Sequence, residues 1–99
     1  MADSKWWLYI VETCYGHFYT GVTTDVARRL KEHTQGAPRG ARALRGKGPL
    51  QLRYKRCIGT RSQAQQIEYA VKQLPRSRKS ALINDECLLE MLVPLPFSE

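Results

Sequence analysis

The sequence predicts a single α+β domain in which strands and helices pack in a sandwich-like arrangement. Two short runs rich in aromatic and β-branched residues flank a polar turn at Gly16, and a later run alternates apolar and polar side chains. Two other stretches space their apolar residues as helices do, each behind a capping residue. The 99 residues, 42% of them hydrophobic, are enough for one core and too few for a second domain.

The first two strands are predicted at residues 6–13 and 18–22, joined as a hairpin. Side chains alternate faces along a strand, so Trp7 and Tyr9 share one face while Leu8 lies on the other. Tyr9 therefore need not belong to the core.

A helix is predicted from Val26 to a point just before Gln35, and three residues in front of it are alternative caps: Thr23, Thr24 and Asp25. Its apolar stripe consists of Val26, Ala27 and Leu30. Arg29 and His33 project from the border of that stripe, and because they are four residues apart they can act on one ligand.

A third strand is predicted at residues 50–58 from its period of two. One face would carry Leu50, Leu52, Tyr54 and Arg56, and the other Gln51, Arg53, Lys55 and Cys57. A second helix follows from about residue 61 to 74, capped by Thr60 and with Ala64, Ile67, Val71 and Leu74 spaced for burial. Glu68 lies at the edge of that stripe, where a carboxylate is expected to be paired or functional.

Pro75 ends the second helix, and residues 80–84 are predicted to start another short one. The organisation expected is a domain over residues 1–84 and a tail over residues 85–99 that packs on the domain and then frays.

Sixteen basic residues against nine acidic ones leave a net charge of +7 and a pI near 9.7, which favours nucleic acid as partner over an acidic membrane surface. Cations cluster with glycines in a loop at residues 36–49 and continue into the third strand: Arg39, Arg42, Arg45, Lys47, Arg53 and Lys55. We expect them to follow a phosphate backbone without reading sequence, and a merely solvated charged face is the alternative.

The chain has no apolar run that could span a bilayer and no signal peptide at its start, so a cytoplasmic protein without a membrane partner is expected. Three widely spaced cysteines, Cys14, Cys57 and Cys87, indicate neither a disulfide framework nor a zinc site.

One ordered set of polar residues carries chemistry: Tyr9, Tyr19, Arg29, His33 and Glu68. In order and spacing it resembles the GIY-YIG nuclease domain, with Trp7-Leu8-Tyr9 and Tyr19-Thr20-Gly21 at the two name motifs. The resemblance covers about residues 7–83. Within the family, the chain is most similar to small stand-alone bacterial members, which in turn resemble the catalytic domain of endonucleases that resolve branched DNA. Trp7 stands where the motif has glycine, and Thr20 where it has isoleucine.

The resemblance implies a three-stranded antiparallel sheet flanked by helices, with the five residues converging on one concave surface. Glu68 would be the only protein carboxylate on a Mg²⁺ ion, with Mn²⁺ as a substitute, and Arg29 would clamp the phosphate. Tyr9 is the first choice as base and Tyr19 the alternative. A phenol has an ordinary pKa near 10, so nearby cations and proton acceptance by His33 would have to assist it, and an alkaline activity optimum would follow.

Structural roles are the alternatives for each of these residues. The tyrosines could be packing residues, Arg29 and Glu68 could form a plain salt bridge between helices, and His33 could cap carbonyl groups at a helix end. Gly21 is expected to serve geometry, by letting the strand end and the helix approach closely.

Taken together, the sequence predicts a metal-dependent endonuclease acting on DNA, with structure rather than sequence deciding where it cuts. RNA is a possible substrate, and cutting both strands of a duplex would call for a protein partner or a homodimer. The alternative from another class is a nucleic-acid-binding module that keeps the nuclease scaffold without useful catalysis.

Overall fold

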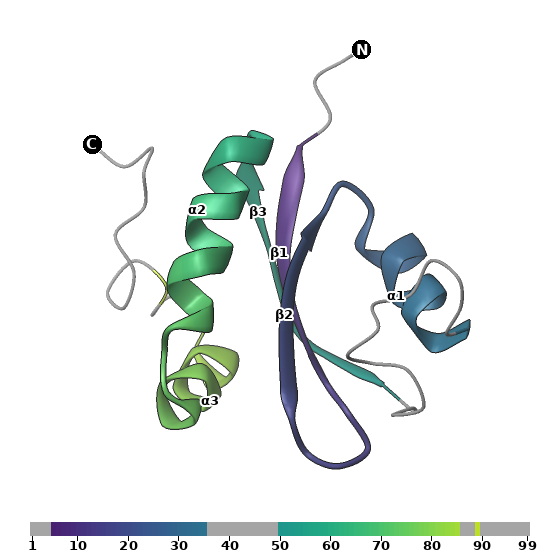
Figure 1. The fold of residues 1–99 in the computed structure, drawn as a ribbon, viewed down its shortest axis with the longest axis vertical. Coiled ribbons are helices and arrows are strands. Elements are labelled where there is room, and N and C mark those ends of the chain that lie inside the picture. Colours follow the sequence, from purple (N-terminus) through teal and green to yellow (C-terminus); the bar gives the residue numbers. More distant parts are fainter. Residues whose placement is uncertain (1–4, 36–49, 86–88, 90–99) are drawn as a thin grey trace.

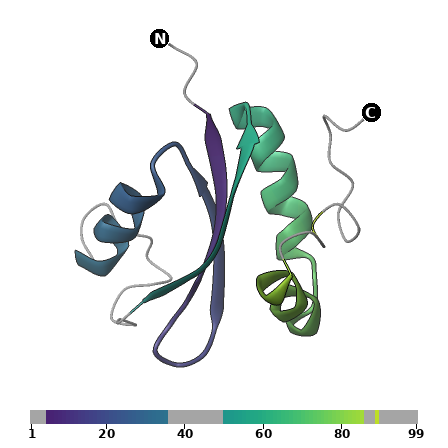
Figure 2. The same cartoon turned by 180° about the vertical axis from the view of Figure 1, so that it is seen from behind.

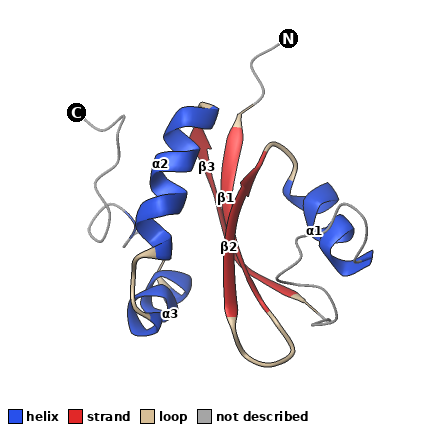
Figure 3. Cartoon of the chain, in the orientation of Figure 1, coloured by secondary structure: helices blue, strands red, loops and turns tan. Residues whose placement is uncertain are grey.

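The computed structural model describes residues 5–35, 50–85 and 89, and the order of its elements is the predicted one (Figure 3). In chain order the elements are β1 (Trp6–Glu12), β2 (Phe18–Thr23), α1 (Val26–Gln35), β3 (Gln51–Gly59), α2 (Arg61–Lys72) and α3 (Arg76–Asn84). The α+β class is therefore confirmed. Of the predicted tail, Asp85 and Leu89 are described, and the division into residues 1–84 and 85–99 stays a prediction.

The three strands form one antiparallel sheet in the order β2-β1-β3, so β1 is the central strand. Tyr9, near its middle, faces Gly21 on β2 and Lys55 on β3. The sheet separates two layers of helix, with α1 on one side and α2 and α3 on the other (Figures 1 and 2).

The alternation along β1 supplies both layers with core residues, as predicted. Leu8 and Ile10 are fully buried against α2 and α3, where Ile67, Val71, Leu82 and Leu89 complete the larger cluster. Tyr9 and Val11 form a smaller cluster on the other face, packed by Tyr19, Val26, Leu30 and Leu50. Tyr9 is only 3% exposed, so it belongs to the core after all.

The predicted alternation of β3 is wrong in part, because one of the two irregularities in its pairing with β1 lies opposite Ile10 and Val11. Tyr54 pairs with Ile10 whereas Leu52, two residues earlier, pairs with the adjacent Val11, so one residue of β3 is extra at this point. Tyr54 consequently packs in the Leu8 cluster and Leu50 in the Tyr9 cluster, although both were expected on one face.

The structure selects Asp25 among the three candidate caps of α1. Its Oδ1 accepts a hydrogen bond from the backbone N–H of Arg28 at 3.1 Å, and its own N–H donates to Thr23 Oγ1 at 3.2 Å. The predicted cap of α2 is confirmed: Thr60 and Gln63 exchange side-chain to backbone hydrogen bonds at 3.2 and 3.0 Å as a capping box.

The third helix is longer than predicted, because Pro75 starts it. The proline has no N–H and a φ of −66°, which suits the residue just before a first helical turn. The basic residues Arg76 and Arg78 therefore belong to that turn, and the Arg76 guanidinium lies 4.2 Å from the ring centroid of Phe18. Among the described residues, no helix is long and apolar enough to cross a bilayer.

Candidate active site

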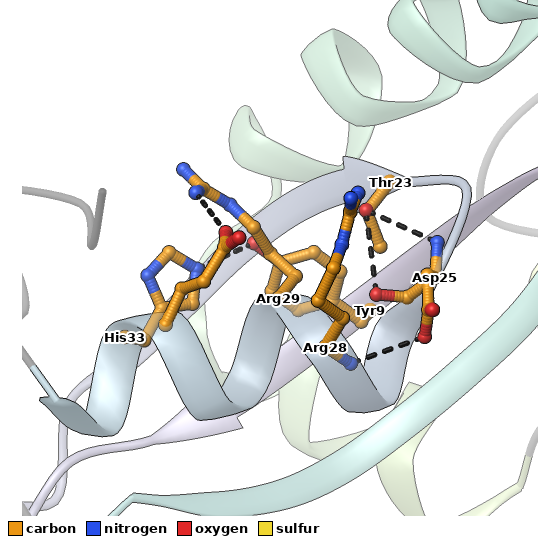
Figure 4. A network of polar contacts seen from close by, with 7 residues as sticks. Tyr9, Thr23, Asp25, Arg28, Arg29 and His33 are labelled. Atoms are coloured by element: carbon orange, nitrogen blue, oxygen red, sulfur yellow. Dashed lines mark hydrogen bonds and ion pairs between the residues drawn. The ribbon is translucent and has the colours of Figure 1, made fainter.

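A hydrogen bond between two buried side chains organises the site. Tyr9 Oη lies 2.8 Å from His33 Nε2, and these residues are 3% and 2% exposed. One comes from the central strand and the other from the last turn of α1, which covers that face of the sheet (Figure 4). His33 Nε2 bonds to Tyr9, and the predicted alternative for His33, a cap on helix carbonyls, stays a prediction.

Gly21 makes this contact possible. It lies directly opposite Tyr9 on β2, and a Cβ atom placed on it would lie 2.5 Å from Tyr9 Oη and 2.7 Å from Tyr9 Cζ. The phenol ring therefore lies across the glycine to reach His33. Gly21 does serve geometry as expected, but the group that approaches it is the Tyr9 side chain rather than a helix.

Tyr19 completes a group of three rings. Its ring centroid is 6.5 Å from that of Tyr9 and 5.6 Å from that of His33, the latter in an edge-to-face arrangement. Tyr19 is partly exposed, whereas Tyr9 and His33 are buried. The two phenols thus differ in access to solvent, with Tyr19 nearer the surface.

Arg29 lies one helical turn before His33 and forms an ion pair within α1. Its Nη1 is 2.9 Å from Glu32 Oε1, and the side chains keep 30% and 17% exposure (Figure 4). Burial alone would lower the pKa of Arg29, but its hydrogen bond to Glu32 and the neighbourhood of Tyr9 raise it. The guanidinium is thus charged, held in place and still accessible from solvent.

Burial dominates the ionisation of Tyr9. Loss of hydration and the neighbouring Tyr19 raise the pKa of Tyr9 to about 12, although the charge of Arg29 and a hydrogen bond with it act in the opposite direction. The expectation that nearby cations bring this pKa below its ordinary value is therefore wrong for the protein alone, because desolvation outweighs the single guanidinium.

The pKa of His33 is lowered, whereas that of Tyr9 is raised. Burial lowers the pKa of its imidazole, the positive charge of Arg29 adds to this effect, and Glu32 opposes it. A neutral imidazole thus faces a neutral phenol at pH 7. In the tautomer with its proton on Nδ1, Nε2 accepts the hydrogen bond that the Tyr9 hydroxyl donates.

Glu68 approaches from the other side of the sheet. It lies on α2, next to the buried Ile67, and its Oε2 forms an ion pair with Lys72 Nζ at 3.2 Å. Its charge raises the pKa of Tyr9, so the carboxylate is within electrostatic range of the phenol. The predicted alternative of an Arg29–Glu68 salt bridge is wrong, because each of these residues pairs within its own helix.

The donor chemistry around Glu68 fits a hard, well-hydrated cation. No group of three or more histidine, cysteine, aspartate or glutamate side chains that could hold a metal occurs within residues 5–35, 50–85 and 89. A lone, partly exposed carboxylate suits Mg²⁺, which retains most of its water ligands, and does not suit Zn²⁺, which takes several protein ligands.

The basic residues predicted to bind nucleic acid divide into two groups. Arg53 and Lys55 lie on β3, where Arg53 Nε pairs with Glu12 Oε1 at 3.2 Å and Lys55 Nζ lies 5.7 Å from the ring centroid of Trp7. The loop residues Arg39, Arg42, Arg45 and Lys47 lie outside the described residues. Their role in binding stays a prediction.

The sequence reasoning missed two residues of this site, Glu32 and Lys72. Glu32 follows Arg29 by three positions and Lys72 follows Glu68 by four, which are the spacings at which opposite charges meet on a helix. These spacings in the sequence predict both ion pairs.

Comparison with known proteins gives a family and several relatives. A family model described as the GIY-YIG catalytic domain matches residues 5–81. The chain is 44% identical over 97 residues to a UPF0213 protein of Photorhabdus laumondii, covering 96% of this chain and 91% of that protein. It is 51% identical over 86 residues to a UPF0213 protein of Yersinia pestis, covering 87% and 88%.

A solved structure is also similar. The solution NMR structure of a UPF0213 protein of Bacillus halodurans is 38% identical in sequence to this chain and superposes on it with a TM-score of 0.52. The match covers 81% of this chain and 83% of that protein. The α+β arrangement described above is therefore shared with a protein whose fold was determined experimentally.

Proposed function

This chain belongs to the GIY-YIG catalytic-domain family, and from that premise we propose that it is a metal-dependent endonuclease that hydrolyses DNA phosphodiester bonds. We propose further that it selects branched or otherwise distorted DNA by structure rather than by base sequence. The observation that carries the proposal is the buried Tyr9–His33 hydrogen bond of 2.8 Å beside the Arg29 guanidinium.

In the proposed reaction Arg29 binds the phosphate that is cut. A guanidinium presents paired donors to two phosphate oxygens, and the ion pair with Glu32 holds it at the edge of the site. Its partial exposure leaves the donors that face solvent accessible to the substrate. Binding would therefore need only a small movement of the side chain.

Tyr9 and His33 are proposed to act together as the base. The phenol of Tyr9 is too weakly acidic to be ionised at neutral pH, since its pKa is about 12. His33, whose pKa is lowered, is neutral and can accept the phenolic proton while the phenol oxygen takes a proton from the attacking water. Tyr19, the alternative base, lies against both rings and is nearer to solvent.

Glu68 is proposed to hold Mg²⁺, or Mn²⁺ in its place. When bound, the ion would supply Lewis-acid stabilisation of charge on the phosphate and the leaving oxygen. Glu68 would have to exchange its contact with Lys72 for the cation, which a side chain 22% exposed can do without unfolding the helix.

Cleavage assays with matched variants test the proposal. Purified protein is incubated with labelled linear, flapped and four-way DNA, with Mg²⁺ or with EDTA. Glu68→Gln should abolish cleavage, whereas Glu12→Gln should not, although Glu12 also forms an ion pair with an arginine at 3.2 Å. Equal cleavage by both variants would identify a contaminant and contradict the proposal.

The second candidate, a binding module without catalysis, is favoured by one observation: in the protein alone the Glu68 carboxylate already has a cationic partner in Lys72. The same experiment decides between the two. Absence of cleavage on every substrate, with DNA binding unaffected by Glu68→Gln, would support the binding module.

A further inference from the structure

Two adjacent tryptophans on β1 have different environments. Trp6 packs against the larger core cluster, and the guanidinium of Arg61 lies 5.6 Å from its ring centroid. Trp7 points to the opposite face, remains partly exposed and contributes to neither described cluster. The Trp7 ring is partly buried, so part of it remains accessible to a ligand.

The neighbours of Trp7 form a small cationic and aromatic surface. Lys55 and Cys57 are exposed on β3, and in the register of the sheet Cys57 faces Trp7 while Lys55 faces Tyr9. Lys55 Nζ lies 5.7 Å from the Trp7 ring centroid. Among the described residues no carboxylate pairs with Lys55, in contrast to Arg53 and Lys72. This surface therefore offers one π-face and one available positive charge.

The same surface adjoins the site. Trp7 and Tyr9 are two residues apart on one strand and face the same side, about 7 Å apart along the sheet. That separation corresponds to about two base steps of a nucleic-acid strand. A strand with one phosphate at Arg29 would need only a few more nucleotides to reach Trp7.

We propose that Trp7 and Lys55 form a binding site for one unpaired nucleotide, with the base stacked on the indole and the phosphate at the Lys55 ammonium. The inference rests on the proposed function for its choice of ligand, since the neighbouring site would act on a nucleic-acid strand. Base stacking requires a base that has left its duplex, so the site selects a single-stranded segment beside the cleavage point. The basic net charge of +7 complements such a ligand.

Lys55 would exchange its contact with the ring for the phosphate. In the protein alone the ammonium lies near the indole, a favourable but modest cation–π contact. Its stem is long and the side chain is exposed, so it can move from the ring to an adjacent phosphate.

Intrinsic fluorescence tests the proposal without catalysis. The full chain and its variants Trp7→Leu and Trp6→Leu are titrated in EDTA with oligothymidylate, oligouridylate and a blunt duplex of equal length. In Trp6→Leu the fluorescence of Trp7 should be quenched by both single strands and not by the duplex. In Trp7→Leu the remaining fluorescence should stay constant, and affinity for single strands should fall about ten-fold.

The lysine is tested by salt dependence. Lys55→Gln should weaken single-strand binding and reduce the slope of log K against log salt by about 0.7, the amount expected for one phosphate contact. Circular dichroism of each variant confirms that it is folded. Equal affinity of the two tryptophan variants, quenching in Trp7→Leu, or equal quenching by duplex would each overturn the proposal.

The readouts separate this site from the proposed nuclease activity. Quenching of Trp7 in a protein that cleaves no DNA would retain the binding site and remove the nuclease. Metal-dependent cleavage with identical single-strand binding by both tryptophan variants would support the nuclease and exclude the nucleotide-binding site at Trp7. Equal quenching by oligouridylate and oligothymidylate would assign the recognition to what the two strands share, the pyrimidine ring and the phosphate, and a preference would assign part of it to the sugar or to the 5-methyl group of thymine.

Discussion

The ring of Tyr9 lies across Gly21, so closely that a single added carbon on the glycine would lie 2.5 Å from the phenol oxygen. The two residues face each other in adjacent strands, and the hydrogen bond from Tyr9 to His33 depends on the Tyr9 ring lying across Gly21. The absence of a side chain at Gly21, in the second motif, thus decides where the phenol of Tyr9, in the first motif, lies.

Gly21→Ala should therefore displace the Tyr9 ring. We expect a loss of stability of about 1–3 kcal/mol from overpacking and a loss of cleavage of about 100-fold from the misplaced phenol. Urea unfolding and DNA cleavage measure the two effects. Gly16→Ala is the control: Gly16 has a φ of +81°, and a Cβ atom placed on it would make only an ordinary contact with Glu12 Oε2 at 3.9 Å. This variant should lose about 1 kcal/mol of stability and keep its cleavage rate.

The cleavage rate should depend on the protonation of His33. Because the pKa of His33 is lowered, the imidazole accepts a proton throughout the neutral range and loses this ability only as pH falls below its ordinary 6.5. A pH–rate profile of single-turnover cleavage should fall on this acid side and be nearly flat from about pH 7 to 9. A tenfold increase per pH unit across that range would show that the phenolate of Tyr9 acts without His33.

Glu32→Gln should move the acid side of this profile. The carboxylate of Glu32 raises the pKa of His33 against burial and Arg29, so its removal should shift the fall in rate to lower pH. Cleavage should also weaken, because Arg29 loses its 2.9 Å partner. Asp25→Asn serves as control: it alters a carboxylate of the same helix that caps Arg28 N–H, and it should leave the profile unmoved.

Tyr9 should make the protein sensitive to alkali. Its pKa is 10.0 when unfolded and about 12 when folded, so the folded state retains the proton more strongly. The stability this contributes is fully present below pH 10 and is lost between pH 10 and 12, by up to about 3 kcal/mol. Urea unfolding at about pH 9 and pH 11 should show this loss in the wild type and in Tyr15→Phe, and a smaller loss in Tyr9→Phe. An identical loss in all three proteins would assign it elsewhere.

Lys72→Met should make the metal easier to bind. Lys72 and the cation would compete for the Glu68 carboxylate, and a helical pair at this spacing contributes only about 0.3–0.5 kcal/mol. The Mg²⁺ concentration for half-maximal cleavage should therefore decrease about two-fold. Arg61→Met removes the same charge from the start of the same helix and should not change it; a decrease in both variants would indicate a general effect of charge.

Much of the fold was predictable because local signals agreed with one another. The cap at Thr60, its partner Gln63 and the apolar spacing of Ala64, Ile67 and Val71 all specify one helix, and the structure forms it. The bulge of β3 opposite Ile10 and Val11 was not predictable in this way. It inserts one residue without a glycine to mark it, so it became visible only in the pairing with β1.

The candidate site shows the same division. Its five polar residues were predicted from their resemblance to a family motif, and the pairs Arg29–Glu32 and Lys72–Glu68 follow spacings that a sequence displays. The direction of the Tyr9 pKa was not predictable, because it depends on how far the ring is removed from water.

The sequence by itself determined the order and type of the elements, the cap of α2 at Thr60 and which residue types are available for chemistry, because these depend on neighbours a few positions apart. Only the tertiary structure decided that Tyr9 crosses Gly21 to meet His33, that burial outweighs Arg29 in setting its pKa, and that Trp7 and Trp6 face different surroundings. These properties depend on desolvation and on contacts between distant segments, which no local pattern encodes.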